Sequence, residues 1–269
     1  MNDPHVVALN YRIDHGDTID YSHAEPLERE EPGFRVTVKD RKVRFELKEH
    51  YATEEQAREA IAEYIRVWEF DATLKHCNFE AFRLVFETPE IVDRKPTPGR
   101  ISLVARGAAG FASLSVSVQE RPPAYPEPPS DIALNPDAKT MHQRYLGYRS
   151  GREPLASMAN FCLTVLEAST GKQRGMRAGA ARIYNVDKRI LDKIGELSAH
   201  RGGTEARKAG GLATEFSSEE RHFLDRALNT IIRRVAQREL TPKGDLPKIS
   251  WSDLPPIESR AKRTPKSGK

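Results

Sequence analysis

The stretch REPLASMANFCLTVLEA, residues 152–168, is the most apolar continuous segment of an otherwise polar chain of 269 residues. Pro154 suits the first turn of a helix. Phe161 and Leu163 widen the apolar face of that helix almost to its full circumference. A helix that is apolar nearly all round is a buried helix, so the stretch predicts the central helix of a helical domain. The apolar residues that recur at helical spacing on its main face are Leu155, Met158, Ala159, Cys162, Val165 and Leu166.

Helical patterns continue on both sides of this stretch. Asp187 is a suitable N-cap, and Ser217 with Glu220 three residues later has the pattern of a capping box. The longest helix begins there and carries an apolar stripe from Phe223 to Val235. We therefore expect an all-α domain over residues 138–240. Its other helices are expected at 138–148, 180–184, 187–198 and 217–240.

Both flanks of the helical domain are rich in proline. Residues 121–136, RPPAYPEPPSDIALNP, hold six prolines, which favour extended chain and predict a linker over 121–137. Tyr125 in this segment indicates packing along a surface. The tail, residues 241–269, has seven Lys and Arg against three Asp and Glu, and we expect it to be basic and largely disordered, with Trp251 able to dock on a domain.

The first half, residues 1–120, has the period-two alternation of strands around one helix. Thr53 and Gln56 have the pattern of a capping box and open a helix expected over 54–68. A polar, acidic segment over 14–33 is expected to be rich in turns. The pattern predicts an α+β domain with an antiparallel sheet of five to six strands. The expected strands lie at 6–13, 34–39, 43–47, 81–86, 101–105 and 114–118.

Charge is divided unevenly between the halves. Residues 1–135 carry 17 Lys and Arg against 24 Asp and Glu, a net charge of −7, whereas residues 136–269 carry 26 against 15, a net charge of +11. A basic surface for a nucleic acid or another anionic partner would therefore lie in the second half. The alternative is that these cations only keep helical surfaces solvated.

Several classes of protein and site are disfavoured by the sequence. There is no apolar run long enough to span a bilayer and no signal-peptide pattern, so we expect a cytoplasmic protein without a membrane partner. Two cysteines exclude a disulfide framework and a Cys-based zinc site. No phosphate-loop or dinucleotide motif appears, so we assign no cofactor. One group of Asp and His residues could ligate a divalent metal, but the segment has the composition of a loop, and we assign no metal there. The group consists of Asp14, His15, Asp17, Asp20 and His23.

The helical half resembles the HEPN superfamily of small helical domains. The resemblance covers residues 138–240 and rests on a central apolar helix, a later helix ending in LSAHRGG at 197–203, a polar loop and a long Arg-rich last helix. It implies a helical bundle. HEPN members include ribonucleases and non-catalytic partners in nucleotide- or RNA-linked stress and defence systems.

Catalytic members of that superfamily carry an Arg and a His separated by four to six residues, often meeting across a dimer interface. Residues 138–240 lack this motif, and the pair Arg44 and His50 has the spacing but falls in the other domain. Lys193 and His200 are the nearest substitute, two turns apart on one flank of a helix. A cation and an imidazole suit phosphate binding and proton transfer, but lysine lacks the bidentate fork of arginine.

The candidate phosphate-binding residues lie in two places. Arg207 and Lys208 stand among paired glycines in the loop after residue 200, while Arg226, Arg233 and Arg234 form a basic edge on the last helix. We therefore expect a non-enzymatic binding module that engages RNA, a nucleotide or a protein partner. The alternatives are a HEPN-like ribonuclease that uses Lys193 and His200 across a dimer, and an adaptor that dimerises through its helical domain.

Overall fold

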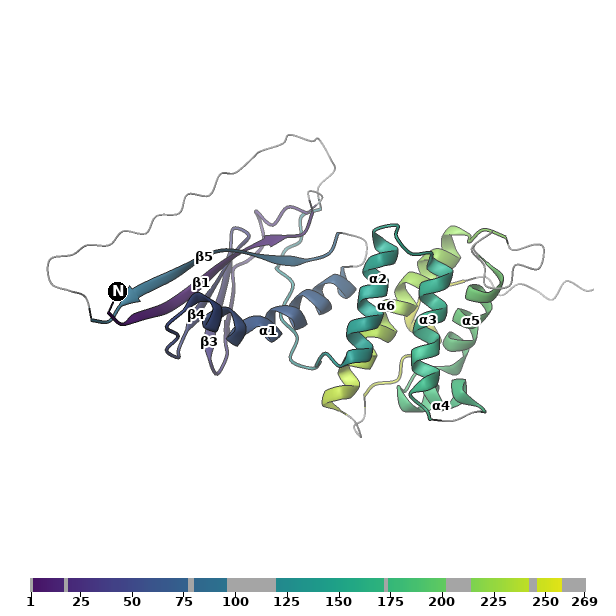
Figure 1. Ribbon diagram of the computed structural model, residues 1–269. Helices are drawn as coiled ribbons and strands as arrows, with labels where there is room; N and C mark the ends of the chain where they lie inside the picture. The colour runs from purple at the N-terminus through teal and green to yellow at the C-terminus, as the bar shows by residue number, and fades with distance from the viewer. Residues whose placement is uncertain are drawn as a thin grey trace, which may run out of the picture. The chain divides into compact units, whose positions relative to one another are not determined.

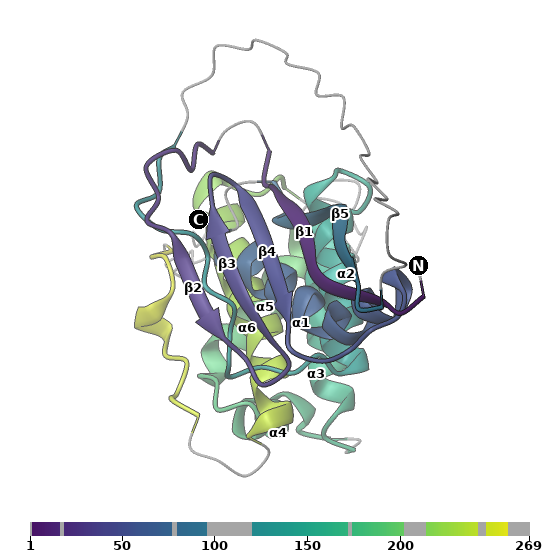
Figure 2. The same cartoon turned by 90° about the vertical axis from the view of Figure 1, so that its left-hand side faces the viewer.

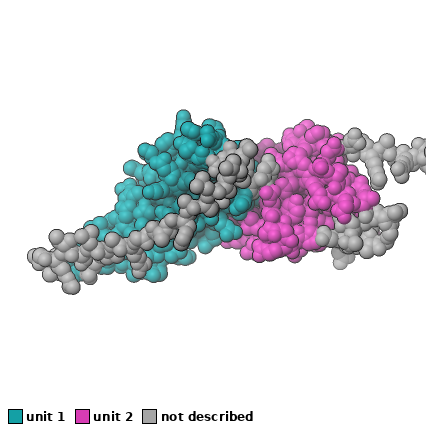
Figure 3. Space-filling view, turned by 90° about the horizontal axis from the view of Figure 1, so that it is seen from above, with its two compact units in different colours: residues 1–130 teal, residues 131–269 magenta. Residues whose placement is uncertain are grey.

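The computed structural model describes residues 2–16, 19–76, 80–95, 120–171, 174–201, 214–241 and 246–257. The chain divides into two compact units, residues 1–130 and 131–269, which Figure 3 colours separately. The first unit contains a sheet and a long helix, and the second is built from helices (Figure 1). An α+β part followed by a helical part is the order that the sequence predicted.

The described residues of the first unit form one antiparallel sheet of five strands in the order β2-β3-β4-β1-β5 (Figure 2). This confirms the predicted antiparallel sheet. The expected strands at 101–105 and 114–118 lie outside the described residues. The strands are β1 (Pro4–Asp14), β2 (Leu27–Glu30), β3 (Phe34–Lys39), β4 (Lys42–Leu47) and β5 (Arg83–Asp93).

The β3–β4 hairpin forms as its alternation predicted. Val36 and Val38 of β3 and Phe45 of β4 are fully buried, whereas their polar neighbours face solvent. Asp40 and Arg41 both adopt positive φ, 53° and 61°, between the paired ends of the two strands. Two successive left-handed residues give a turn whose twist matches that of a hairpin.

Strand β2 lies within residues 14–33, for which the sequence predicted a turn-rich segment and no strand. Its sequence, Leu-Glu-Arg-Glu, has a single apolar residue and gives no alternating signal. The strand exists because it pairs with β3, with Leu27 opposite Val38 and Glu30 opposite Arg35. Charged side chains suit such an outer strand, since they discourage pairing with other chains.

Helix α1 (Glu54–Lys75) packs on one face of the sheet through Ala57, Ile61 and Trp68. It runs seven residues beyond the predicted end, and Phe70 and Leu74 in this extension are also buried. The hydroxyl of Thr53 accepts the expected hydrogen bond from the backbone of Gln56. The return bond of the predicted capping box differs, because the Gln56 side chain accepts from the backbone of Ala52 at 3.2 Å.

Residues 120–130 of the proline-rich segment belong to the first unit and pack along it. Tyr125 is buried and stacks on Tyr21 with 4.9 Å between the ring centroids. The indole of Trp68 donates a hydrogen bond of 2.9 Å to the carbonyl of Pro126. Proline removes N–H donors but leaves carbonyls, so the segment accepts hydrogen bonds from the domain that it covers.

The second unit is a helical bundle around α3. The fully buried side chains of Met158 and Cys162 lie on this helix, which packs against each of the other four helices. This confirms the central position predicted for residues 152–168. Burial raises the pKa of the Cys162 thiol to about 12, which makes it an inert core group. The helices are α2 (Pro136–Arg149), α3 (Leu155–Ala168), α4 (Met176–Ile183), α5 (Lys188–His200) and α6 (Ser218–Leu240).

Residues 246–257 of the tail pack on the helical bundle. The backbone of Ile249 pairs with the segment after α4, donating to Asn185 at 2.9 Å and accepting from Asp187 at 2.8 Å. The Trp251 ring lies 5.2 Å from the Phe223 ring of α6, which is the docking that the sequence suggested for this tryptophan. The remaining tail, 258–269, lies outside the described residues.

Candidate nucleic-acid interface

The turn between α2 and α3 lies at one end of the helical bundle, and α5 ends and α6 begins at the same end (Figure 1). Gly151 makes the first turn possible with a φ of 70°. The N-terminus of α6 is held by the predicted capping box between Ser217 and Glu220, with hydrogen bonds of 3.1 and 2.9 Å. Local sequence signals therefore fix where these helices begin and end.

A cleft of about 420 Å³ opens at this end and includes Tyr148, Arg152, Phe216 and Arg221 in its lining. The guanidinium of Arg221 lies over the Phe216 ring, 5.5 Å from its centroid, and is 3.6 Å from the Glu215 carboxylate. Arg152 is exposed, and its Nε donates to the Ser150 hydroxyl at 2.8 Å. The lining thus contains two guanidinium groups and a tyrosine ring, together with the carboxylates of Glu153 and Glu215.

Two ion pairs hold the elements around the cleft. Arg201, just after α5, donates to Glu220 of α6 at 2.9 Å, and both side chains are largely covered. Arg149 at the end of α2 lies 3.7 Å from Asp225 of α6. Burial raises the pKa of the Asp225 carboxyl, and burial together with the nearby Asp225 charge raises the pKa of Tyr148. These contacts fix the backbone that carries the two cleft arginines.

The structure places Lys193 and His200 apart along α5. The Lys193 ammonium binds Glu196 at 3.0 Å, and its side chain is only 13% exposed. His200 is the exposed last residue of the helix. Seven residues of helix separate them by about 10 Å along the axis. Within one chain, the two groups are not arranged to act on one phosphate.

The basic residues predicted on α6 also have separate environments. Arg226 is exposed, whereas Arg233 donates to the Asp131 carboxylate at 2.8 Å and is 22% exposed. Arg234 is buried and donates to backbone carbonyls, so it does not present a basic edge together with Arg226 and Arg233. Arg207 and Lys208 lie outside the described residues. The cleft arginines, Arg152 and Arg221, were missed by the sequence analysis because their proximity depends on the bundle.

His15, in the polar segment after β1, has a structural role. His15 is fully buried, and its Nδ1 lies 2.7 Å from the Tyr21 hydroxyl. Burial, His76 and Arg41 lower the pKa of His15 to about 4. Asp20 binds Arg121 at 3.2 Å and His23 is exposed. Among the described residues there is no group of three or more His, Cys, Asp or Glu side chains arranged to hold a metal ion.

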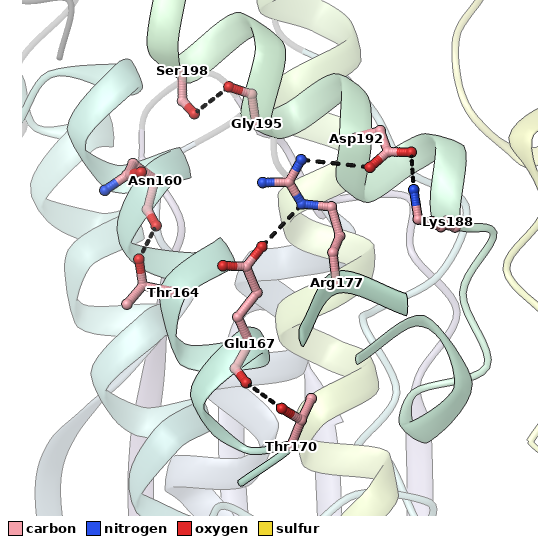
Figure 4. Close-up of polar contacts among 9 residues, drawn as sticks. All are labelled: Asn160, Thr164, Glu167, Thr170, Arg177, Lys188, Asp192, Gly195 and Ser198. Atoms are coloured by element: carbon pink, nitrogen blue, oxygen red, sulfur yellow. Dashed lines mark hydrogen bonds and ion pairs between the residues drawn. The ribbon is translucent and has the colours of Figure 1, made fainter. Parts of the chain in front are cut away.

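A polar cluster at the α4 end of the bundle was also missed by the sequence analysis (Figure 4). Arg177 of α4 donates to Glu167 of α3 at 2.9 Å and to Asp192 of α5 at 3.4 Å. Lys188 reaches the other oxygen of Asp192 at 2.6 Å. The guanidinium of Arg177 lies against Gly195, where any Cβ would approach it to 2.8 Å. This arrangement neutralises its own charges and joins three helices, which is a structural role.

A cleft of about 480 Å³ in the first unit lies between α1 and strands β1 and β5 of the sheet. Its central contact is Arg58, whose guanidinium lies 4.4 Å from the centroid of the Phe86 ring and 3.2 Å from Glu54. Glu69, in the same lining, accepts from the Leu84 backbone at 2.7 Å, and burial raises its pKa. The polar groups of this lining are thus engaged with one another.

The comparisons with known proteins assign no class to this site: no protein-family model matches the chain, and neither the curated proteins nor the solved structures include a match. No helix among the described residues combines the length and apolar character needed to cross a bilayer.

Proposed function

We propose that residues 131–269 form a non-enzymatic module that binds single-stranded RNA at the α2–α3 end of the bundle. The observation that carries the proposal is the cleft in which Arg152 and Arg221 stand beside Tyr148. Guanidinium groups pair with phosphates, and both guanidinium planes and aromatic rings stack on unpaired bases. The resemblance to HEPN domains supports the same proposal.

The distribution of charge supports a second contribution, from four segments that lie outside the described residues. Residues 172–173, 202–213, 242–245 and 258–269 together carry nine Lys and Arg against three Asp and Glu. The rest of this unit, which the structure describes, carries 17 against 13, and many of its cations are paired with carboxylates. Non-specific attraction to RNA should therefore come mainly from the first group, and positioning from the cleft.

The test separates these two contributions. Binding of a labelled single-stranded RNA is measured across a salt series for the whole chain, for a truncation after residue 257, and for the double variant Arg152→Ala/Arg221→Ala. Each lost phosphate contact lowers the salt slope by about 0.7 on single strands. We expect the double variant to lower the slope by about 1.4 and to weaken binding at least tenfold.

The matched control removes the same charge at the other end of the bundle. Arg174 and Arg182 are both exposed, and the variant Arg174→Ala/Arg182→Ala should bind nearly as the wild type does. Equal losses in the two double variants, or full loss on truncation with no effect of the cleft variant, would contradict binding at the cleft. If the wild-type protein binds a protein partner but not RNA, the alternative of an adaptor that dimerises through its helical domain is favoured.

The same reactions test the ribonuclease alternative. The RNA is examined on a gel after the binding measurement, with wild type and His200→Ala run side by side. A non-enzymatic module leaves the RNA intact in both. Cleavage by the wild type that disappears in the His200→Ala variant would favour the ribonuclease alternative over our proposal. For Lys193 of a second protomer to take part in that cleavage, the protein would also have to be a dimer in these samples.

A further inference from the structure

Two histidines face each other at one end of the sheet. His15 lies at the opposite end of β1. His5 lies near the start of β1, and His50 lies in the connection between β4 and α1. Their Nδ1 atoms are 3.1 Å apart, and their rings are stacked with 4.9 Å between centroids and 28° between planes. A backbone hydrogen bond of 2.9 Å from Val6 to Tyr51 holds the two segments side by side.

The separation of the two nitrogens matches the spacing of neighbouring ligands on one metal ion. Zinc binds imidazole nitrogen at about 2.0–2.1 Å, so two such ligands are about 3.4 Å apart at a tetrahedral angle and about 2.9 Å apart at a right angle. A value of 3.1 Å falls between these limits. An ion could therefore be held by both nitrogens with only small movements of the rings.

The pair can be reached from solvent. His5 is 9% exposed, whereas the His50 side chain is 40% exposed. A nearly buried ligand is thus paired with an open one.

The outer nitrogen of His50 faces a carboxylate. Asp3 Oδ1 lies 4.0 Å from His50 Nε2, and Lys95 lies 3.9 Å from the other Asp3 oxygen. The Asp3 backbone is held in turn, because its N–H donates to Asp93 at 3.0 Å. A carboxylate near the second nitrogen favours the tautomer with its proton on Nε2, which leaves Nδ1 free to bind a metal.

We propose that His5 and His50 form a two-imidazole site for a transition-metal dication such as Zn²⁺ or Ni²⁺. Each ring binds the ion through Nδ1 and carries its proton on Nε2. Water completes the coordination, because the described residues provide no third His, Cys, Asp or Glu side chain for the site. The proposal concerns the sheet unit and is independent of RNA binding by the helical unit.

The test is a titration of the full chain with Zn²⁺ or Ni²⁺ at pH 7.5 after treatment with a chelator. Calorimetry reports the stoichiometry, and nitrogen NMR shifts of the imidazoles report which ring atoms bind. We expect one ion per chain, with both Nδ1 signals of the pair perturbed. His50→Gln should weaken binding at least tenfold, and its circular dichroism should match that of the wild type because the side chain is partly exposed.

The matched control is His23→Gln, which removes an exposed histidine from the same unit and should leave affinity and stoichiometry unchanged. The proposal is overturned if His50→Gln and His23→Gln have equal affinities. It is also overturned if the metal leaves both Nδ1 signals unchanged. In either case the pair is an ordinary N–H···N hydrogen bond that links β1 to the segment before α1.

Discussion

Arg234 is buried and stabilises the helical unit through hydrogen bonds to backbone carbonyls. The residue is 4% exposed, and its guanidinium donates to the carbonyls of Tyr184 and Pro247 at 2.8 and 2.7 Å. We expect Arg234→Met to lower the free energy of unfolding by about 2–4 kcal/mol, because buried acceptors lose charged donors. Denaturant unfolding measures this loss.

The control for that prediction lies four residues further along α6. Arg238→Met removes a partly exposed arginine and should change the free energy of unfolding by about 0.5 kcal/mol or less. If both variants were equally stable, the hydrogen bonds of Arg234 would not contribute to the fold. Faster proteolysis near residues 246–249 in the Arg234 variant alone would support the contact with Pro247.

His142 makes stability depend on pH. Burial lowers its pKa to about 4, below the value of 6.5 for an unfolded chain. Between these values the unfolded chain binds the proton more readily, so stability falls as the pH falls from about 6.5 to 4 and then levels off. At pH 5 the loss from this residue is about 2 kcal/mol.

The measurement compares denaturant unfolding at pH 7.5 and at pH 5. In the variant His142→Leu, the difference between the two pH values should shrink by about 2 kcal/mol relative to the wild type. His222→Leu, an exposed histidine in the same unit, serves as the control and should retain the wild-type difference. An unchanged difference in His142→Leu would mean that this imidazole is solvated in the folded chain.

At the scale of elements, one side chain of α4 makes polar contacts with two neighbouring helices. Arg177 links it to α3 and α5, and its guanidinium occupies the space beside Gly195 (Figure 4). Alanine at position 195 gains about 1 kcal/mol of helix propensity but must displace that guanidinium. Partly exposed ion pairs contribute about 0–1 kcal/mol, so the two effects nearly cancel.

A double-mutant cycle isolates this coupling. Gly195→Ala should change the free energy of unfolding by less than about 0.5 kcal/mol in the wild type and raise it by about 1 kcal/mol in an Arg177→Ala background. Denaturant unfolding of the four proteins gives the coupling energy. Equal effects of Gly195→Ala in both backgrounds would show that the position of the Arg177 guanidinium is not energetically coupled to residue 195.

At the scale of the whole molecule, each unit has its own core and the chain passes between them once. We expect residues 1–130 and residues 131–269 to fold when produced separately, with circular dichroism spectra that add up to that of the whole chain. The helical fragment should retain RNA binding, and the sheet fragment should not bind RNA. Failure of either fragment to fold would show that the units need each other.

The order of elements could be predicted because periodicity is a local property of sequence. Alternating residues gave the β3–β4 hairpin, and helical spacing with caps gave α1, α3, α5 and α6. Strand β2 could not be predicted, since its four residues carry one apolar side chain and depend on pairing with β3. Docking of Trp251 was expected, but the backbone pairing of Ile249 with Asn185 and Asp187 was missed because these partners are distant in sequence.

The candidate sites show the same division. Sequence by itself determined that the basic excess belongs to the second half and that a buried helix, 152–168, organises it, because composition and spacing are written along the chain. Only the tertiary structure decided that Arg152 and Arg221 line one cleft, that Arg234 is buried, and that His5 faces His50. Each of those pairings or environments joins positions far apart in the sequence, and no local pattern records such a distance.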